Sequence, residues 1–205
     1  ERQVIEWCRQ IMGFPESASG LIVSGTSMAT IIALKIARDQ RIADARNSGT
    51  LPGLTGYASE QAHSCIGRAF DLLGIGSDSL RKIPCDESFK MNVQELNATI
   101  DKDNDNGLTP FVIIGTAGSV NVGAIDSLDS LADTASVRNL WFHVDGAFGA
   151  TAILCPEIKP LLKGLERADS LGFDFHKWLH VNYDAGCVLV RSKEKHLESF
   201  SGRPE

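Results

Sequence analysis

Apolar runs and segments of helical periodicity alternate along the chain. Seven short runs rich in Val, Ile, Leu and Phe have the length and composition of strands. They occupy residues 20–25, 55–59, 80–85, 110–118, 140–147, 169–176 and 185–191. Helical periodicity is seen at residues 26–40, 59–74, 92–107 and 127–138, and in a shorter stretch broken by prolines at 155–168. The alternation predicts an α/β fold, with a mostly parallel seven-stranded sheet and helices on both faces.

Composition and charge narrow the class of protein. The chain is 43% hydrophobic and 22% charged, with a net charge of −6 and scattered basic residues, which is typical of a globular protein and argues against nucleic acid as a partner. No apolar run reaches the length of a membrane span, and the first residues do not form a signal peptide. The chain opens directly in an amphipathic pattern and stops at the loop-like "SGRPE". We therefore expect a segment of a longer protein, with no membrane partner.

The cysteines indicate the compartment. There are five, an odd number, widely spaced and without a CxxC pair. This pattern favours neither a disulfide framework nor a metal site. Reduced thiols in a cytoplasmic protein are the expected state.

Unusual polar residues follow four of the predicted strands, where ligands of such sheets bind. In "SGTSMA", Thr26 and Ser27 open a helix whose free N–H groups could hold a phosphate, although a plain helix cap is the commoner use of such residues. In "SEQAHS", His63 is placed in the first turn of the next helix, where a lone histidine is more often a surface or core residue.

The other two strand ends carry a carboxylate and an amine. Asp145 in "HVDGAFGA" is followed by small residues such as Ala147, so the buried carboxylate requires a donor or a cation, or simply caps the next turn. Lys177 in "DFHKW" is expected to be partly buried among aromatic residues that fix its position. Such a lysine could form a Schiff base with an aldehyde, or could extend from a loop into solvent.

The four positions together match the requirements of pyridoxal 5'-phosphate. Its phosphate suits a helix N-terminus, its aldehyde a lysine, and its ring nitrogen an Asp. His63 could stack on one face of its ring, with Ala147 on the other. No metal is expected.

Over nearly its whole length the chain resembles the pyridoxal-phosphate-dependent decarboxylases of the glutamate and aromatic-amino-acid group, which have fold type I. The resemblance is carried by five motifs. They are "SGTSMATIIALKIAR", "YASEQAHSCIGRAFDLLG", "GTAGSVNVGAIDSL", "LWFHVDGAFGA" (compare W-x-H-V-D-A-A-Y-G-G) and "ERADSLGFDFHKWLHVNYDAGCVLVR" (compare A-D-S-x-x-x-x-P-H-K-W).

The resemblance implies a function and residue roles. Residues 1–205 would be the cofactor-binding large domain of a homodimeric decarboxylase, without the family's N-terminal segment and C-terminal small domain. The substrate would be an L-amino acid, aromatic or acidic, converted to its amine and carbon dioxide. Lys177 would form the Schiff base, Asp145 would pair with the ring nitrogen, and His63 would stack on the ring and assist proton transfer. The remaining cofactor contacts would be Thr26, Ser27, Ala147, Asp174 and His176.

Four departures from the family pattern blur the substrate assignment. They are Met28 for Glu, Ser119–Val120 for a Thr pair, Phe148 for Tyr or Trp, and Phe175 for Pro. Two other interpretations stay open at this point. One is another pyridoxal-phosphate-dependent lyase, of the carbon–carbon lyase or cysteine desulfurase type. The other is a non-catalytic relative that keeps the fold for dimerisation.

Overall fold

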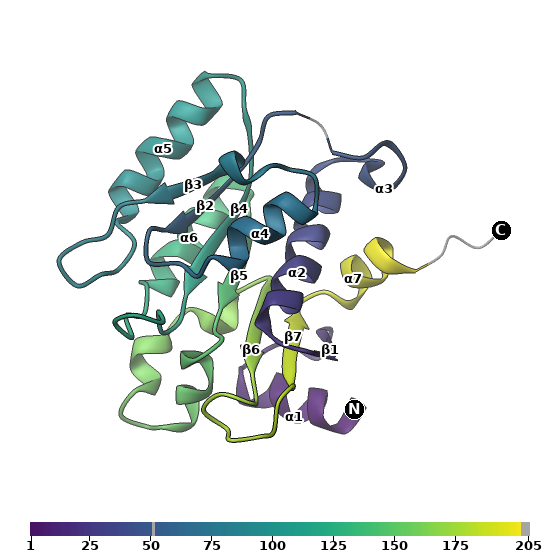
Figure 1. The fold of residues 1–205 in the computed structure, drawn as a ribbon, viewed down its shortest axis with the longest axis vertical. Coiled ribbons are helices and arrows are strands. Elements are labelled where there is room, and N and C mark those ends of the chain that lie inside the picture. Colours follow the sequence, from purple (N-terminus) through teal and green to yellow (C-terminus); the bar gives the residue numbers. More distant parts are fainter. Residues whose placement is uncertain (51, 202–205) are drawn as a thin grey trace.

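A computed structural model describes residues 1–50 and 52–201 and contains one seven-stranded sheet (Figure 1). The spatial order is β1-β7-β6-β5-β4-β2-β3, and all neighbours pair in parallel except β7, which is antiparallel to both β1 and β6. The strands are β1 (Ser19–Val23), β2 (Leu54–Ser59), β3 (Leu80–Ile83), β4 (Thr109–Thr116), β5 (Trp141–Asp145), β6 (Ser170–Asp174) and β7 (Gly186–Val190). The predicted mostly parallel α/β fold is confirmed.

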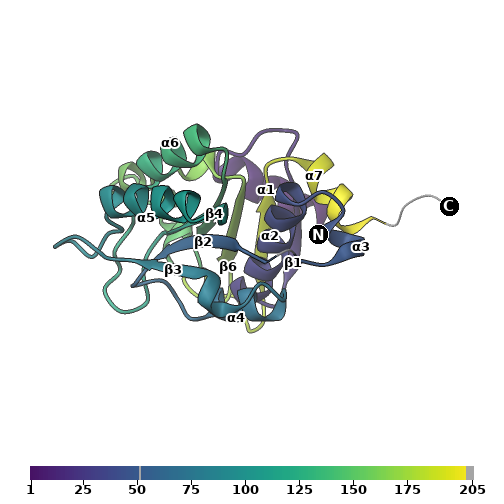
Figure 2. The same cartoon turned by 90° about the horizontal axis from the view of Figure 1, so that it is seen from above.

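Helices cover both faces of the sheet, as Figure 2 shows from above. One core packs α1, α5 and α6 against the sheet, and the other packs α2 and α4 against the opposite face. The helices are α1 (Arg2–Ile11), α2 (Thr26–Arg41), α3 (Ala45–Ser48), α4 (Cys65–Leu72), α5 (Val93–Asp105), α6 (Leu128–Arg138) and α7 (Lys193–Phe200). Short 3-10 helices lie at Ser77–Ser79, Gly149–Leu154, Lys159–Leu162 and Leu165–Arg167. Within the described residues, no helix combines the length and the apolar character needed to cross a bilayer.

The first strand is an edge strand, which the sequence did not predict. Its apolar run "GLIV" is typical of a strand buried on both faces, but Leu21 and Ile22 are exposed. The strand pairs on one side only, with β7. By contrast, the central strand β4 is buried from Pro110 to Thr116, as its continuous apolar run predicts.

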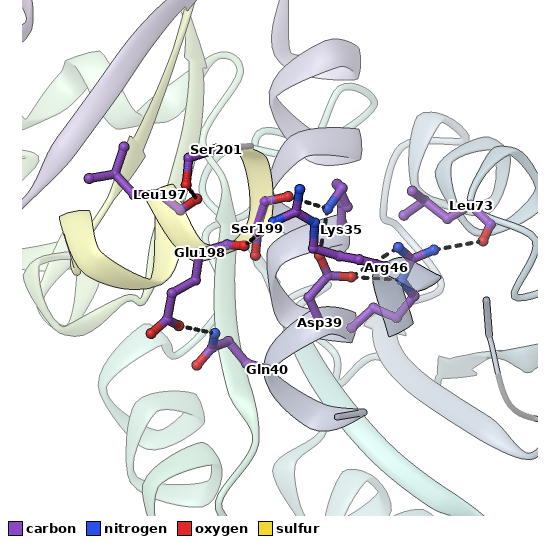
Figure 3. A network of polar contacts seen from close by, with 10 residues as sticks. Lys35, Asp39, Gln40, Arg46, Leu73, Leu197, Glu198, Ser199 and Ser201 are labelled. Carbon is purple, nitrogen blue, oxygen red and sulfur yellow. Dashed lines mark hydrogen bonds and ion pairs between the residues drawn. The ribbon is translucent and has the colours of Figure 1, made fainter. Parts of the chain in front are cut away.

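Helix α7 docks on α2 and α3 through the carbonyls at its C-terminal end (Figure 3). Lys35 Nζ donates to Ser199 O at 2.6 Å, and Arg46 Nη1 donates to Glu198 O, also at 2.6 Å. Cations at a helix C-terminus satisfy carbonyls that lack intrahelical partners and interact favourably with the helix dipole. This network joins α7 to the helix that begins beside the candidate site.

The sheet topology brings several chain segments to one edge. Because only β7 is reversed, the carboxyl ends of β1, β4, β5 and β6 lie together, and the loop from β6 returns directly into β7. Gly186 begins β7 where a Cβ would lie 2.6 Å from Gly25 Cα, so a glycine is needed for this close backbone approach. The start of α2 is thereby held against the β6–β7 hairpin.

Candidate active site

A cavity of about 270 Å³ opens at this edge of the sheet. All eight residues that the sequence singled out line it: Thr26, Ser27, His63, Asp145, Ala147, Asp174, His176 and Lys177. They come from the start of α2, the loop before α4, the end of β5 and the turn after β6. The structure thus brings together positions that are up to 151 residues apart, from Thr26 to Lys177.

The start of α2 presents hydrogen-bond donors to the cavity. The Thr26 backbone N–H donates to Asp174 Oδ1 at 2.7 Å. The Thr26 hydroxyl is buried, at 4% residue exposure, and Oγ1 has no hydrogen-bond partner. Ser27 follows in the same turn, and its backbone N–H is one of those that an α-helix leaves without an intrahelical acceptor. This end of the helix can therefore bind an anion.

Asp145 ends β5 at the buried side of the cavity. Its Oδ1 accepts a hydrogen bond from the Ala147 N–H at 3.1 Å. Burial raises the pKa of the Asp145 carboxyl, and the Ala147 N–H, Lys177 and His63 partly oppose this increase. A donor or cation from a bound ring would offset the remaining cost of burying the charge.

Lys177 lies in the turn after β6, and its surroundings differ from those expected. Its Nζ is 2.8 Å from Asp174 Oδ2 and 4.3 Å from the centroid of the Phe148 ring. Trp178 is 54% exposed, and Phe173 and Phe175 pack with the core on the α1 side. Phe173 and Phe175 therefore anchor the turn, while Phe148 is the ring that contacts the amine.

The two histidines are positioned by backbone N–H groups. His63 precedes α4 instead of lying in its first turn, because its Nδ1 accepts the N–H of Cys65, where the helix begins, at 3.2 Å. His176 Nδ1 accepts the Ala185 N–H at 2.9 Å, and its ring stacks on Tyr183 with centroids 3.9 Å apart. Each imidazole thus has Nδ1 engaged as an acceptor, which leaves Nε2 as the nitrogen that carries the proton of the neutral ring.

Three further cavity residues were missed by sequence reasoning. Thr116 pairs in register with Asp145, is 5% exposed, and has an Oγ1 without a partner. Cys65 lines the cavity with a thiol whose pKa is raised to about 11 by burial, so it stays protonated. Tyr183 lies on the β6–β7 hairpin. A hydroxyl at the end of a buried strand was the available signal for Thr116.

The donor set fits a flat, phosphorylated aldehyde with a ring nitrogen. Thr26 and Thr116, whose hydroxyls have no hydrogen-bond partner, line the same cavity as the buried Asp145 carboxylate and the Lys177 amine. Such polar atoms are rarely left unsatisfied in a folded protein unless a ligand or water completes them. In the described part of the chain, no group of three or more His, Cys, Asp or Glu side chains could hold a metal ion.

Comparisons with known proteins agree with this geometry. The conserved-domain model of pyridoxal-dependent decarboxylases matches residues 1–204. An aromatic-L-amino-acid decarboxylase of Bacillus atrophaeus is 40% identical over 205 residues, which cover 100% of this chain and 42% of the relative. The crystal structure of mouse CSAD superposes with a TM-score of 0.95 at 32% identity, covering 100% of this chain and 43% of that one. That of Oryza sativa TDC with PLP and tryptamine gives 0.90 at 30% identity, covering 99% and 44%. The chain spans less than half the length of these three relatives.

Proposed function

Because the chain belongs to the pyridoxal-dependent decarboxylase family, we propose that its cavity binds pyridoxal 5'-phosphate and that the protein decarboxylates an L-amino acid to the corresponding amine. The observation that carries this proposal is the buried Asp145 in a cavity that Lys177 also lines. A buried carboxylate and a primary amine in one cavity are the two groups that the ring nitrogen and the aldehyde of this cofactor require.

Each part of the cofactor has a partner among the cavity residues. Lys177 would hold the aldehyde carbon and Asp145 the ring nitrogen. Thr26, Ser27 and His176 would hold the phosphate. His63 and Ala147 would contact the two faces of the ring, and Asp174 would orient Lys177. When bound, the cofactor supplies an electron-accepting ring for the electron pair that carbon dioxide leaves behind.

The protein's own residues would manage charge and protons. Asp145, ionised next to a ring N–H, would keep that proton on the nitrogen, because a buried carboxylate is stabilised by a donor in contact with it. His63 has Nδ1 engaged by the Cys65 N–H, so His63 Nε2 is the atom that would move a proton near the substrate. Asp145 would thus keep a proton on the ring nitrogen, and His63 would transfer a proton near the substrate.

The cavity lining supports an aromatic substrate over an acidic one. Met28, Val120, Phe148 and Tyr183 line the cavity, and Met28, Val120 and Tyr183 are exposed. Among its described lining residues, Lys177 is the basic side chain besides two histidines, and it is assigned to the cofactor. Apolar and aromatic groups favour a flat apolar side chain, whereas a second carboxylate would require a cation.

A cytoplasmic homodimer is the proposed setting, and two observations support it. The five cysteines form no disulfide, which suits a reducing compartment. Exposed large apolar side chains on α1 and the β6–β7 hairpin, namely Trp7, Ile11, Trp178, Leu179 and Val181, suit a surface that packs against a second copy.

Absorption spectra and product analysis test the proposal. The wild-type chain, mixed with pyridoxal 5'-phosphate, should acquire the visible absorption of a lysine-bound cofactor, and Lys177→Ala should not. Carbon dioxide release should then be measured over a panel of L-amino acids, with the largest rate expected for an aromatic one. Transamination or carbon–carbon cleavage without carbon dioxide would refute decarboxylation. An absence of cofactor binding would refute the whole proposal.

A further inference from the structure

Asp174 contacts both elements that receive the cofactor. It is the last residue of β6 and is 2% exposed. Its Oδ1 accepts the Thr26 N–H at 2.7 Å, and its Oδ2 lies 2.8 Å from Lys177 Nζ and 3.6 Å from His176 Nε2. One carboxylate therefore occupies a donor at the helix N-terminus and pairs with the reactive amine.

The two contacts have opposite consequences for cofactor binding. The hydrogen bond fixes the first turn of α2, which orders the remaining donors there. The negative charge, however, lies at the end of the helix that would attract a phosphate, and like charges at short range repel strongly in a partly buried site. The ion pair also holds Lys177 Nζ against the carboxylate, so the amine must leave this contact before it can attack an aldehyde.

We propose that Asp174 is a positioning residue that restrains cofactor loading: it holds α2 and the Lys177 ammonium in place, and its charge opposes entry of the phosphate. This inference rests on the proposed function of the cavity. In this inference the hydrogen bond of Asp174 orders the start of α2, and its charge opposes the phosphate. A substitution that keeps the hydrogen-bond acceptor and removes the charge distinguishes these two effects.

The lysine reaction to be followed has a simple balance. Lys177 first loses a proton to solvent, and the Nζ lone pair then adds to the aldehyde carbon. The aldehyde oxygen leaves as water, and a carbon–nitrogen double bond replaces the carbon–oxygen one. Pyridoxal undergoes this reaction without carrying a phosphate, so it reports on the amine alone. Inorganic phosphate reports on the helix end alone.

Asp174→Asn is the test variant, and Asp169→Asn is the matched control. Asn retains an oxygen that can accept the Thr26 N–H. Asp169 lies next to the opposite end of β6, where its carboxylate accepts the Phe142 N–H at 2.9 Å. Both changes therefore remove one buried or half-buried carboxylate that binds a backbone N–H, but only the first does so in the cavity.

Three ligands are measured on the cofactor-free full chain at neutral pH. For Asp174→Asn, inorganic phosphate should bind about tenfold more tightly than to wild type, by calorimetry. Pyridoxal should add to Lys177 about tenfold faster, by absorption. The dissociation constant of pyridoxal 5'-phosphate should fall by at least the same factor as that of inorganic phosphate. Asp169→Asn should match wild type with all three ligands.

Several results would overturn the inference. Unchanged or weaker phosphate binding in Asp174→Asn, together with wild-type rates for pyridoxal, shows that the charge does not restrain loading. Equally tight phosphate binding and equally fast pyridoxal addition in Asp169→Asn would show that only the net charge of the protein matters. Asp174→Ser, which also keeps an oxygen acceptor, is measured in parallel, so a folding defect in one variant does not decide the outcome. If wild type and Lys177→Ala bind pyridoxal 5'-phosphate equally, the proposed function itself fails.

Discussion

The side chain of Ala150 fills the space that a side chain on Gly146 would need, because a Cβ on Gly146 would lie 2.5 Å from Ala150 Cβ. The corresponding family pattern, D-A-A-Y-G-G, has alanine at the first of these positions and glycine at the second. This chain has the reverse, "DGAFGA". The two residues thus form an exchanged pair that keeps the total volume beneath the site constant.

Gly146→Ala alone is expected to lower the free energy of unfolding by about 1–3 kcal/mol, because it overpacks a buried contact. Adding Ala150→Gly should restore most of the loss, which a double-mutant cycle by urea unfolding would measure as a strong favourable coupling. Gly67→Ala is the control: a Cβ there meets nothing within 4 Å, so this helical site in α4 should be stabilised by about 0.5–1 kcal/mol. Additive effects of the pair would contradict the packing argument.

Asp145→Asn is expected to stabilise the cofactor-free chain at neutral pH. Burial raises the pKa of Asp145 above its ordinary value of 3.8, so the folded chain is penalised for ionising it. The advantage of the variant is absent below pH 3.8, where folded and unfolded wild type are both protonated, and it grows as the pH rises from there towards the folded pKa. At neutral pH the variant should therefore have a higher free energy of unfolding than wild type.

Urea unfolding of both proteins across this pH range provides the measurement. The same variant should lose affinity for pyridoxal 5'-phosphate, since Asn cannot supply the negative charge for the ring nitrogen. A variant that is less stable than wild type at neutral pH would show that Asp145 is needed for folding and not only for the cofactor.

His143 is expected to make the chain sensitive to mild acid. It is fully buried on β5, its Nδ1 bonds to Ser170 Oγ at 2.9 Å, and its Nε2 has no partner. Burial lowers its pKa from 6.5 to about 4. The unfolded chain therefore takes up the proton first. The stabilising contribution of neutral His143 is complete above pH 6.5 and is lost as the pH falls towards 4.

Replacement by Asn, which can keep the bond to Ser170, should remove this dependence. Relative to His143→Asn, wild type should lose about 3 kcal/mol of unfolding free energy between these two pH values. His180→Asn changes an exposed histidine and should leave the wild-type profile unaltered. Parallel profiles for wild type and His143→Asn would contradict the prediction.

Sequence patterns predicted the seven strands because each is short, apolar and bounded by turn residues. They could not predict that β7 is reversed, since pairing direction depends on where the hairpin after Lys177 leads. The edge position of β1 was missed for the same reason. Leu21 and Ile22 are residue types that are usually buried, and they are exposed here because β1 is the last strand of the sheet.

The site was predictable to the extent that chemistry shows in residue type. Charged or aromatic side chains at strand ends drew attention to Lys177, Asp145 and His63. Thr116 did not, because a hydroxyl within an apolar run does not reveal whether its oxygen has a partner. The ion pair between Asp174 and Lys177 could not be predicted either. A spacing of three residues brings two side chains together in a helix, but here it spans the end of a strand and the turn after it.

The hairpin that carries Lys177 is closed by hydrogen bonds between its two ends. Phe175 and His176 donate their backbone N–H groups to Ala185 O, and the Ala185 N–H returns to His176 Nδ1. Residues 178–184, which lie between these hydrogen-bonded residues, are exposed. Exposed positions of this segment whose side chains contact neither the cavity nor the proposed dimer surface can therefore be changed while the amine keeps its place. Because Tyr183 of this segment lines the cavity, a change at that position can alter what the cavity accepts while the hydrogen bonds around Lys177 remain.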